Sequence, residues 1–455
     1  MNILHYTIGL PPYRHGGSIQ YANDLIQEQS KNNNVFALTC GDTLFKPSKV
    51  IIKFKYQKDN IKVYSLENPI TPTLIYGTSN PKSQHKSLKI DYNNIKRFIE
   101  DNNIEVLHMH TLMGMHQDII KYIKHLGVKI FYTTHDFHGI CPHYNLLDYE
   151  GNLCHSVSSI RCAICNLQEP SEIFLKLVNS SLFQKLKSRG ILNTFIKSKP
   201  HFIHQKEICL SSKDYEKAQK KSEEYDDLIE YYKEYLSLFD KIHFNSQQTK
   251  DIITSFIPSA KGEVVNVITS GIKDKRRLVS PSQTIALGFI GSLNDYKGFP
   301  ILKRAIVELK NENINNLFIK VYGNDKVGID EECNNIEYYP SYKYDELSDI
   351  LYNLDGVIVP SKWYETFSLV TLESLAHGRP VFVSDHVGAK DIVAQYYPKG
   401  IFSTPEQLKT LLRQISSDTS ILTEYSHLIL ENPWPFSIKN HVSDMLKFYK
   451  IDNHE

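Results

Sequence analysis

Two glutamates, Glu365 and Glu373, are eight positions apart in WYETFSLVTLESLAHGRPV, where the next charged residue is Arg379. We expect a helix to begin near Phe367, so that its first backbone N–H groups lack intrahelical partners and can bind an anion such as phosphate. Glu373 has largely apolar neighbours, and a half-buried carboxylate is costly unless it accepts hydrogen bonds. Ligand hydroxyl groups would supply them. The ordinary alternatives are a helix-capping residue for Glu365 and a solvated helix face for Glu373.

Two further segments could bind phosphate. In PPYRHGGSIQYANDL, Gly16 and Gly17 precede a helix, which allows close approach of a ligand to backbone N–H groups, although a simple tight turn has the same pattern. In FIGSLNDYKGFPILKRAI, a strand ends at Gly291, and Lys297 stands where a helix starts. A lysine there could reach a diphosphate as a point charge, and a surface lysine is the alternative.

Histidines follow two expected strands of the first half. His135 ends the strand in KIFYTTHDFHG, and His108 and His110 end the strand in HMHTL. The carboxyl ends of parallel strands form the ligand crevice of doubly wound sheets. His108 and His110 are two positions apart and therefore share a side of their strand. A solvated loop histidine is the alternative at each position.

A cluster of cysteines, Cys141, Cys154, Cys162 and Cys165, has the spacing C-x12-C-x7-C-x2-C. In a reducing compartment four thiols with a terminal C-x-x-C favour a tetrahedral structural zinc site over disulfides. His143 or His155 could replace one ligand. Free thiols that pack together are the alternative.

Apolar strands alternate with amphipathic helices along most of the chain, which predicts parallel sheets covered on both faces. We expect strands at 2–8, 35–39, 106–110, 129–134, 284–291, 317–323, 355–361 and 380–385, and helices at 18–30, 117–125, 297–310, 343–353 and 366–377. Ser18 is the expected N-cap of the first helix. The polar stretch 273–284 resembles a linker between two doubly wound α/β domains.

The composition is that of a globular protein of two or three domains, because 455 residues exceed one typical core and 41% of them are apolar. A net charge of +1 does not point to nucleic acid. No apolar run approaches the roughly 20 residues that cross a bilayer. The N-terminus also lacks the basic region and cleavage site of a signal peptide. We therefore expect a cytoplasmic protein.

Several motifs occur together in one order: GGSIQYANDL, TTHDF, FNSQQTKD, VITSGI, FIGSLNDYKG and the E-x7-E pair with LAHGRPV. This series resembles the retaining family-4 glycosyltransferases, and it covers the chain broadly. The resemblance implies the GT-B fold, an α/β architecture in which two Rossmann-like doubly wound domains face each other across a cleft. It also implies an acceptor-side domain at 1–272 and a nucleotide-sugar-binding domain at 273–430. We expect 431–455 to form a helix that packs back on the first domain.

The resemblance assigns roles to residues at the matching positions. The catalytic set is His135, near the transferred sugar, Glu365, which contacts the donor sugar, and Lys297, which neutralises the diphosphate. The donor-binding set is Gly16, Gly17, Gly291, Ser292, Lys297, Phe367, Ser368, Leu369, Val370 and Glu373, with Glu373 on the ribose hydroxyls and residues 367–370 offering backbone N–H groups. No cofactor is required for catalysis in this scheme, and zinc would be structural.

One position departs from the family. Ser292 stands where an arginine is usual, so one of two charges expected on the leaving phosphates is missing. Arg379 and Lys362 are the candidates that could replace it. The substitution bears on catalytic strength more than on the fold.

The first domain is longer than a minimal enzyme of this kind requires. It contains a Cys-rich loop at about 141–165, which resembles a loop found after the active-site histidine in a subset of the family, and a helical insertion at about 167–240. The stretch 173–199 mixes basic and apolar residues, and it either lies on an anionic membrane surface or forms a solvated or inter-domain helix.

The expected activity is transfer of a sugar from a nucleotide-diphosphate sugar, a UDP-sugar, to a glycan or lipid-linked acceptor with retention of configuration. Such an enzyme would serve polysaccharide or glycoconjugate synthesis in the cytoplasm, with peripheral contact to the inner face of the membrane. The alternatives are a nucleotide-sugar epimerase of similar fold and a non-catalytic nucleotide-sugar-binding partner subunit.

Overall fold

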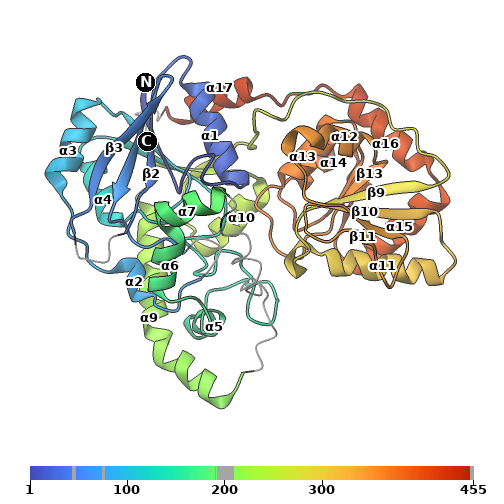
Figure 1. Ribbon diagram of the computed structural model, residues 1–455, viewed down its shortest axis with the longest axis horizontal. Helices are drawn as coiled ribbons and strands as arrows, with labels where there is room; N and C mark the ends of the chain where they lie inside the picture. Colours follow the sequence, from blue (N-terminus) through green and yellow to red (C-terminus); the bar gives the residue numbers. More distant parts are fainter. Residues whose placement is uncertain (44–47, 74–76, 190, 192–209, 451–455) are drawn as a thin grey trace. The chain divides into compact units, whose positions relative to one another are not determined.

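The computed structural model describes residues 1–43, 48–73, 77–189, 191 and 210–450. The chain divides into two compact units (Figure 1). The N-terminal unit comprises residues 1–245, 249–269 and 438–455, and the C-terminal unit comprises residues 246–248 and 270–437.

The sheet of the N-terminal unit has the strand order β3-β4-β2-β1-β5-β6-β7-β8. Its strands are β1 (Asn2–Thr7), β2 (Asn34–Cys40), β3 (Ile51–Lys58), β4 (Ile61–Glu67), β5 (Val106–Met109), β6 (Lys129–Thr133), β7 (Lys241–Phe244) and β8 (Gly262–Val264). Neighbouring strands run parallel except β3 and β4. The strand order changes direction between β1 and β5, which is the position where doubly wound sheets bind ligands.

Helices connect and follow these strands in the N-terminal unit (Figure 1). They are α1 (Gly17–Gln29), α2 (Lys82–His85), α3 (Tyr92–Asp101), α4 (Gln117–His125), α5 (Ser159–Cys165), α6 (Glu172–Asn179), α7 (Ser181–Ser188), α9 (Ser212–Ser237), α10 (Gln247–Phe256) and α17 (Ile438–Phe448). Helix α1 buries Ile19, Leu25 and Ile26, as its apolar spacing predicts. The prediction that Ser18 is the N-cap is wrong, because the helix begins at Gly17. The N-cap is Gly16, which makes no side-chain capping bond.

The sheet of the C-terminal unit has the order β11-β12-β10-β9-β13-β14-β15 and is parallel except for β11. Its strands are β9 (Ile285–Ile290), β10 (Leu317–Tyr322), β11 (Gly328–Ile329), β12 (Ile336–Tyr338), β13 (Gly356–Val359), β14 (Val381–Ser384) and β15 (Ile401–Phe402). Its helices are α11 (Phe299–Asn311), α12 (Leu347–Tyr352), α13 (Leu369–Ala376), α14 (Lys390–Tyr396), α15 (Pro405–Ser417) and α16 (Ser420–Glu431), with short 3-10 turns η1 (Asp295–Lys297), η2 (Tyr344–Glu346) and η3 (Pro398–Gly400). The prediction of doubly wound α/β architecture is confirmed for both sheets.

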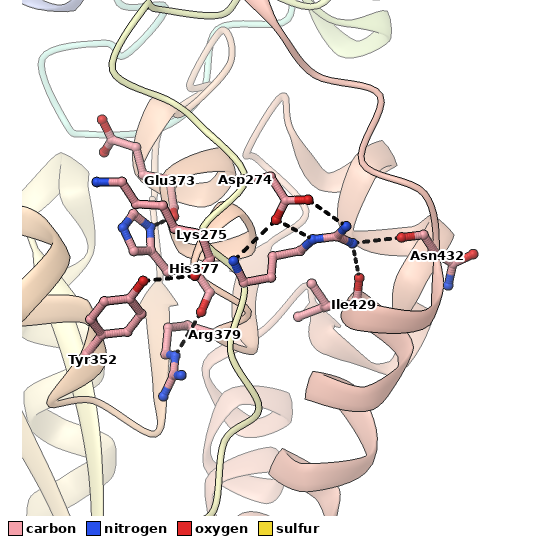
Figure 2. Close-up of polar contacts among 9 residues, drawn as sticks. Asp274, Lys275, Tyr352, Glu373, His377, Arg379, Ile429 and Asn432 are labelled. Carbon is pink, nitrogen blue, oxygen red and sulfur yellow. Dashed lines mark hydrogen bonds and ion pairs between the residues drawn. The ribbon is translucent and has the colours of Figure 1, made fainter.

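The segment 273–284 is not a free linker, which corrects the sequence-based interpretation. It runs along the C-terminal unit, where Arg276 donates hydrogen bonds to Asp274 and to the carbonyls of Ile429 and Asn432 at the end of α16 (Figure 2). Val279 is buried. The segment resembles a linker because it is rich in polar and charged residues. In the structure, Arg276 pairs with Asp274 and with carbonyls at the end of α16, which holds the segment in place.

The basic stretch 173–199 is described in part, since residues 190 and 192–199 lie outside the described residues. The described portion includes α7 and most of α6, and it exposes the apolar side chains of Ile173, Leu177 and Leu182. No helix among the described residues is long and apolar enough to cross a membrane.

Candidate functional site

The N-terminus of α13 is the phosphate-binding candidate of the C-terminal unit. The helix begins at Leu369, two residues later than predicted, and Ser368 precedes it with φ 87° and ψ 90°. A residue other than glycine rarely adopts this backbone conformation, and strained backbone of this kind is typical of ligand-binding sites. Phe367 is buried, and its carbonyl accepts a hydrogen bond from the Ala389 N–H. The loop is therefore fixed before the helix starts, and the first N–H groups of α13 lie in a defined place.

Glu365 and Lys297 form an ion pair in the same unit. The Lys297 Nζ lies 2.6 Å from Glu365 Oε1, and the Ser361 hydroxyl donates to Glu365 Oε2 at 2.6 Å. The Lys297 ammonium also lies 5.4 Å from the centroid of the Trp363 ring. Both members of the pair keep some exposure, 26% for the lysine and 15% for the glutamate side chain, so the ammonium can reach a ligand phosphate. The structure thus brings together two of the predicted catalytic residues.

Gly298 explains how Lys297 reaches this position. It has φ 78° and joins η1 to α11. A Cβ atom at Gly298 would lie 1.7 Å from the Pro360 carbonyl oxygen, at the end of β13. Because glycine alone fits this contact, the turn that carries Lys297 packs directly against the strand that leads to Glu365.

Glu373 is 7% exposed on α13. Burial raises the pKa of its carboxyl to about 7, and the hydrogen bond with Tyr344 opposes this rise. The Glu373 backbone carbonyl accepts from His377 Nδ1 (Figure 2). The backbone of α13 is therefore held at its C-terminal end.

The position of the missing arginine is occupied by a small polar network. The Asn294 side-chain amide donates to the Ser292 hydroxyl at 3.1 Å, directly after Gly291. Arg379 does not replace the missing charge: it is buried, and its guanidinium donates to the carbonyls of His377, Leu354 and Arg277 (Figure 2 shows the first of these bonds). Lys362 is exposed and remains the other candidate.

The segment Ser246–Gln248 belongs to this site although it is remote in sequence. The Ser246 hydroxyl donates to the Thr366 carbonyl at 2.7 Å, and the Gln248 amide donates to the carbonyls of Glu365 and His386. Sequence reasoning gave these residues no role. The motif FNSQQTKD was the available signal, but the motif alone does not say which loop it supports.

The predicted residues of the N-terminal unit lie after β1 and β6. Gly16, with φ 140°, and Gly17 are exposed at the start of α1, where no side chain caps the helix. Burial lowers the pKa of His135 to about 3, with the nearby His243 as a second cause, so His135 is neutral near pH 7. Its ring contacts the rings of Tyr21 and His110, with centroids 5.0 and 5.8 Å away.

A buried histidine cluster extends from this point into the sheet. Among the described residues, His5, His108 and His110 are the group of three or more whose potential metal-ligating atoms lie within 4.8 Å of one another. His5 pairs with His108 across the parallel strands β1 and β5. The sequence predicted the shared side of His108 and His110, but it gave no indication of His5.

The four clustered cysteines line one cavity. Cys162 and Cys165 come from α5, and Cys154 follows a short bridge between Leu147 and Leu153. Burial raises the pKa of the thiols, to about 11 for Cys141 and about 12 for Cys162. Their sulfur atoms do not form a group of three within 4.8 Å of one another.

Comparison with known proteins identifies the C-terminal unit. Residues 272–426 match the family described as "Glycosyl transferases group 1", so this segment, which contains Lys297, Glu365 and Glu373, is a glycosyl transferases group 1 domain. No curated protein sequence matches the chain.

Solved structures match the chain over nearly its whole length at low sequence identity. A sucrose-phosphate synthase from Thermosynechococcus elongatus is 12% identical, with 99% of this chain and 98% of that chain covered and a TM-score of 0.55. HepE from Anabaena in complex with UDP-glucose is 12% identical, with 98% and 99% covered and a TM-score of 0.51. An alpha,alpha-trehalose-phosphate synthase (UDP-forming) from Burkholderia xenovorans in complex with glucose-6-phosphate is 10% identical, with 99% and 100% covered and a TM-score of 0.54. These similarities show that the chain has the GT-B fold.

Proposed function

We propose that this protein is a retaining glycosyltransferase that moves a sugar from a UDP-sugar to a glycan, lipid-linked or other hydroxyl-bearing acceptor. The observation that carries the proposal is the site around α13, where Lys297, Glu365 and the Ser368 turn meet in a glycosyl transferases group 1 domain. The structural neighbour in complex with UDP-glucose and the one described as UDP-forming support a nucleotide-sugar donor.

The leaving diphosphate gains negative charge as the glycosidic bond breaks. Lys297 would leave its ion pair with Glu365 to contact the phosphates, and the positive end of α13 would add the N–H groups of residues 367–370. The Glu365 carboxylate, then released, would accept hydrogen bonds from the donor sugar. Ser292 supplies no charge, so the lysine and the helix end carry most of this stabilisation.

Glu373 would hold the ribose hydroxyls. A carboxylate accepts hydrogen bonds from two neighbouring hydroxyls without needing a cation, and the buried position makes each bond stronger than in water. Ionisation of this carboxyl becomes favourable when such donors arrive, because they stabilise the charged form.

The N-terminal unit would add the exposed N-terminus of α1 and the neutral His135. Gly16 and Gly17 let a diphosphate approach the N–H groups of α1. His135, being neutral, would act as a hydrogen-bonding partner of the transferred sugar instead of a charged acid.

We also propose a structural zinc ion in the cavity of Cys141, Cys154, Cys162 and Cys165, whose binding would draw together sulfur atoms that lie farther apart in this structure and so fix the loop that follows His135. Zinc ligands are thiolates, and a bound cation offsets the cost of ionising buried thiols. Elemental analysis of reduced protein should find one zinc ion per chain, lost in the Cys162→Ser, Cys165→Ser double variant. Absence of zinc from the reduced protein would refute this site.

The acceptor side is proposed from chemistry alone. The exposed apolar side chains of α6 and α7, beside basic residues, suit contact with an anionic membrane surface where lipid-linked acceptors lie, and this would place the enzyme at the cytoplasmic face of the membrane in polysaccharide or glycoconjugate synthesis.

Incubation with labelled nucleotide sugars tests the proposal. A panel of UDP-, GDP- and ADP-sugars is first screened for thermal stabilisation, since a ligand that binds the folded state raises the melting temperature. The stabilising sugar is then incubated with candidate acceptors, and products are separated. Transfer supports the proposal, isomerisation of the donor would identify an epimerase, and binding without turnover would identify a partner subunit.

A further inference from the structure

A continuous series of hydrogen bonds links four buried histidines of the N-terminal unit. We call it the histidine network; its members, all 3% exposed or less, are His5, Gln29, His108, His110, Thr133, His243 and Tyr449. Burial lowers the pKa of each histidine, to about 4 for His5 and His243 and well below the ordinary value for His108 and His110. The four imidazoles are therefore neutral near pH 7, and each has one N–H donor and one lone pair.

The direction of the network is fixed at one end by a carbonyl group. His243 Nε2 lies 2.6 Å from the Val265 carbonyl oxygen, which accepts only, so His243 Nε2 carries the hydrogen. His243 Nδ1 then accepts from the Thr133 hydroxyl at 2.8 Å. Because the hydroxyl has a single hydrogen, Thr133 must accept from His108 Nε2 at 2.6 Å. The lone pair of His108 is consequently on Nδ1.

The same reasoning continues through Tyr449 and Gln29. His108 Nδ1 accepts from the Tyr449 hydroxyl at 2.7 Å, so the Tyr449 oxygen accepts in turn from the Gln29 amide nitrogen at 3.3 Å. The Gln29 amide oxygen, 2.8 Å from His5 Nε2, accepts from it. The lone pair of His5 is therefore on Nδ1.

The series ends at His110. His5 Nδ1 lies 3.0 Å from His110 Nε2, which must donate, so the lone pair of His110 is on Nδ1. That atom is buried and has no hydrogen-bond partner among the described residues. A buried acceptor without a donor is costly, and a position of this kind in a native protein calls for a ligand or water.

The location of His110 identifies a kind of ligand. It directly follows β5, at the carboxyl end of the sheet and beside the point between β1 and β5 where the strand order changes direction. The rings of Tyr21 and His135 lie next to it, with centroids 5.7 and 5.8 Å away. The Nδ1 lone pair of a neutral imidazole accepts a hydrogen bond and does not attract an anion. A hydroxyl group is therefore a better partner for it than a phosphate.

We propose that His110 is a sugar-binding residue, whose Nδ1 lone pair, fixed by the histidine network, accepts a hydrogen bond from a substrate hydroxyl that reaches it when the His135 ring turns aside. The inference rests on the proposed function, because it takes the ligand to be a carbohydrate. Gln29 and Tyr449 would act as positioning residues that hold the tautomer of His5 and so of His110.

Two substitutions at His110 separate the acceptor from the donor. His110→Asn can place its amide oxygen near the position of Nδ1, whereas His110→Gln can keep a donor to His5 near the position of Nε2 and removes the acceptor. With the nucleotide sugar that the wild type turns over, we expect kcat/KM to fall roughly threefold to tenfold in His110→Gln, as for loss of one neutral hydrogen bond, and less in His110→Asn. The exposed His125→Gln on α4 is the matched control and should be unchanged.

Binding of UDP alone should be the same in His110→Gln and wild type, because UDP has no sugar hydroxyl beyond its ribose. Equal kcat/KM in wild type and His110→Gln would overturn the inference and leave the proposed function intact. Failure of every nucleotide sugar to bind or turn over would instead refute the proposed function, and the inference with it.

Imidazole nitrogen NMR of the full chain tests the tautomer directly. We expect His110 to show an unprotonated Nδ1 and a protonated Nε2, with the Nδ1 signal moved by the UDP-sugar that binds and not by UDP. Tyr449→Phe interrupts the network and should let His5 and His110 exchange tautomers, whereas Phe448→Leu next to it should not. A protonated Nδ1 in the wild type would overturn the inference, as would zinc added alone shifting His5, His108 and His110 together, which would identify a metal site.

Discussion

The two units have similar doubly wound sheets, but they differ in the polar groups that lie near the carboxyl ends of their strands. In the C-terminal unit, charge is kept near the surface: Lys297 pairs with Glu365, both are partly exposed, and both lie near an uncapped helix end. In the N-terminal unit, the polar groups are neutral, buried and joined in one direction from Val265 to His110. Under the proposed function, the C-terminal unit would therefore suit a leaving group that gains charge, and the N-terminal unit would suit hydroxyl groups that stay neutral.

This difference shows how much each unit depends on distant residues. The ion pair needs one loop and one turn, held by Gly298, while the histidine network needs β1, β5, β6, β7, α1 and the C-terminal helix α17 with Tyr449 just beyond it. A substitution in the ion pair would change the charge at one place. A substitution in the histidine network would change which ring nitrogen carries the proton in a histidine several residues away.

Lys297→Ala, which removes the ammonium of the ion pair, should have the largest effect. We expect kcat to fall roughly 10²- to 10³-fold, as for loss of one well-placed stabilising donor, while the melting temperature changes little because the pair is partly solvated. The measurement is steady-state transfer with the stabilising nucleotide sugar. Lys310→Ala, at the exposed end of α11 and bonded to Asn334, is the control. Full activity of Lys297→Ala would show that the charge at this site does not serve the diphosphate.

Glu373→Gln tests whether the buried carboxyl of the C-terminal unit acts as a charged acceptor. We expect the affinity for UDP at pH 8 to fall roughly 10- to 100-fold, since hydrogen bonds to a charged group contribute about 1.5–3 kcal/mol. Titration calorimetry at pH 8 and pH 6 provides the check. Because the pKa of Glu373 is about 7, the carboxyl is mostly protonated at pH 6, and the difference between wild type and variant should narrow there. A difference that is the same at both pH values would contradict the role assigned to the charge.

The same variant should change the pH dependence of stability without ligand. Burial raises the folded-state pKa of Glu373 from 4.5 to about 7, so between these values the folded state holds more protons than the unfolded state. The free energy of unfolding therefore decreases as pH rises through this window. Glu373→Gln lacks this decrease, and at pH 8 it should be more stable than wild type by about 1–3 kcal/mol. Urea unfolding at pH 5 and pH 8 measures the difference, and parallel pH profiles for the two proteins would exclude an ionised, buried Glu373.

The sequence predicted the arrangement of the candidate residues better in the C-terminal unit than in the N-terminal unit for a physical reason. Glu365 and Glu373 lie in adjacent segments, the loop before α13 and α13 itself, so the sequence alone places them in one region, and Lys297 is recognisable at a helix start. The helix start was displaced by two residues because the strained Ser368 turn overrides local preference. The role of Arg379 could not be deduced, since it depends on carbonyl groups brought together by the fold.

The histidine network could not be predicted, because its members are spread from His5 to Tyr449 and each is an ordinary residue in its own segment. The alternation of strands and helices predicted both sheets and placed His110 and His135 at strand ends. It did not give the pairing of His5 with His108, and the family resemblance, which predicted that 431–455 pack back on the first domain, did not name α1 as the contact. Strand order and the return of the chain to the first unit are set by long-range packing.

Substitutions at Ser368 should have a smaller effect, and they test whether the turn before α13 is strained. Ser368→Gly and Ser368→Ala both remove the hydroxyl that accepts from Thr371, so they differ mainly in their tolerance of φ 87°. We expect the glycine variant to be more stable than the alanine variant by about 1 kcal/mol, because a Cβ atom is unfavourable in this region and the extra freedom of unfolded glycine offsets part of the gain. Chemical denaturation of both variants measures this difference directly. Equal stability would mean that the turn relaxes at no cost, in which case the N–H groups of α13 are not held ready for a phosphate but are ordered when the ligand binds.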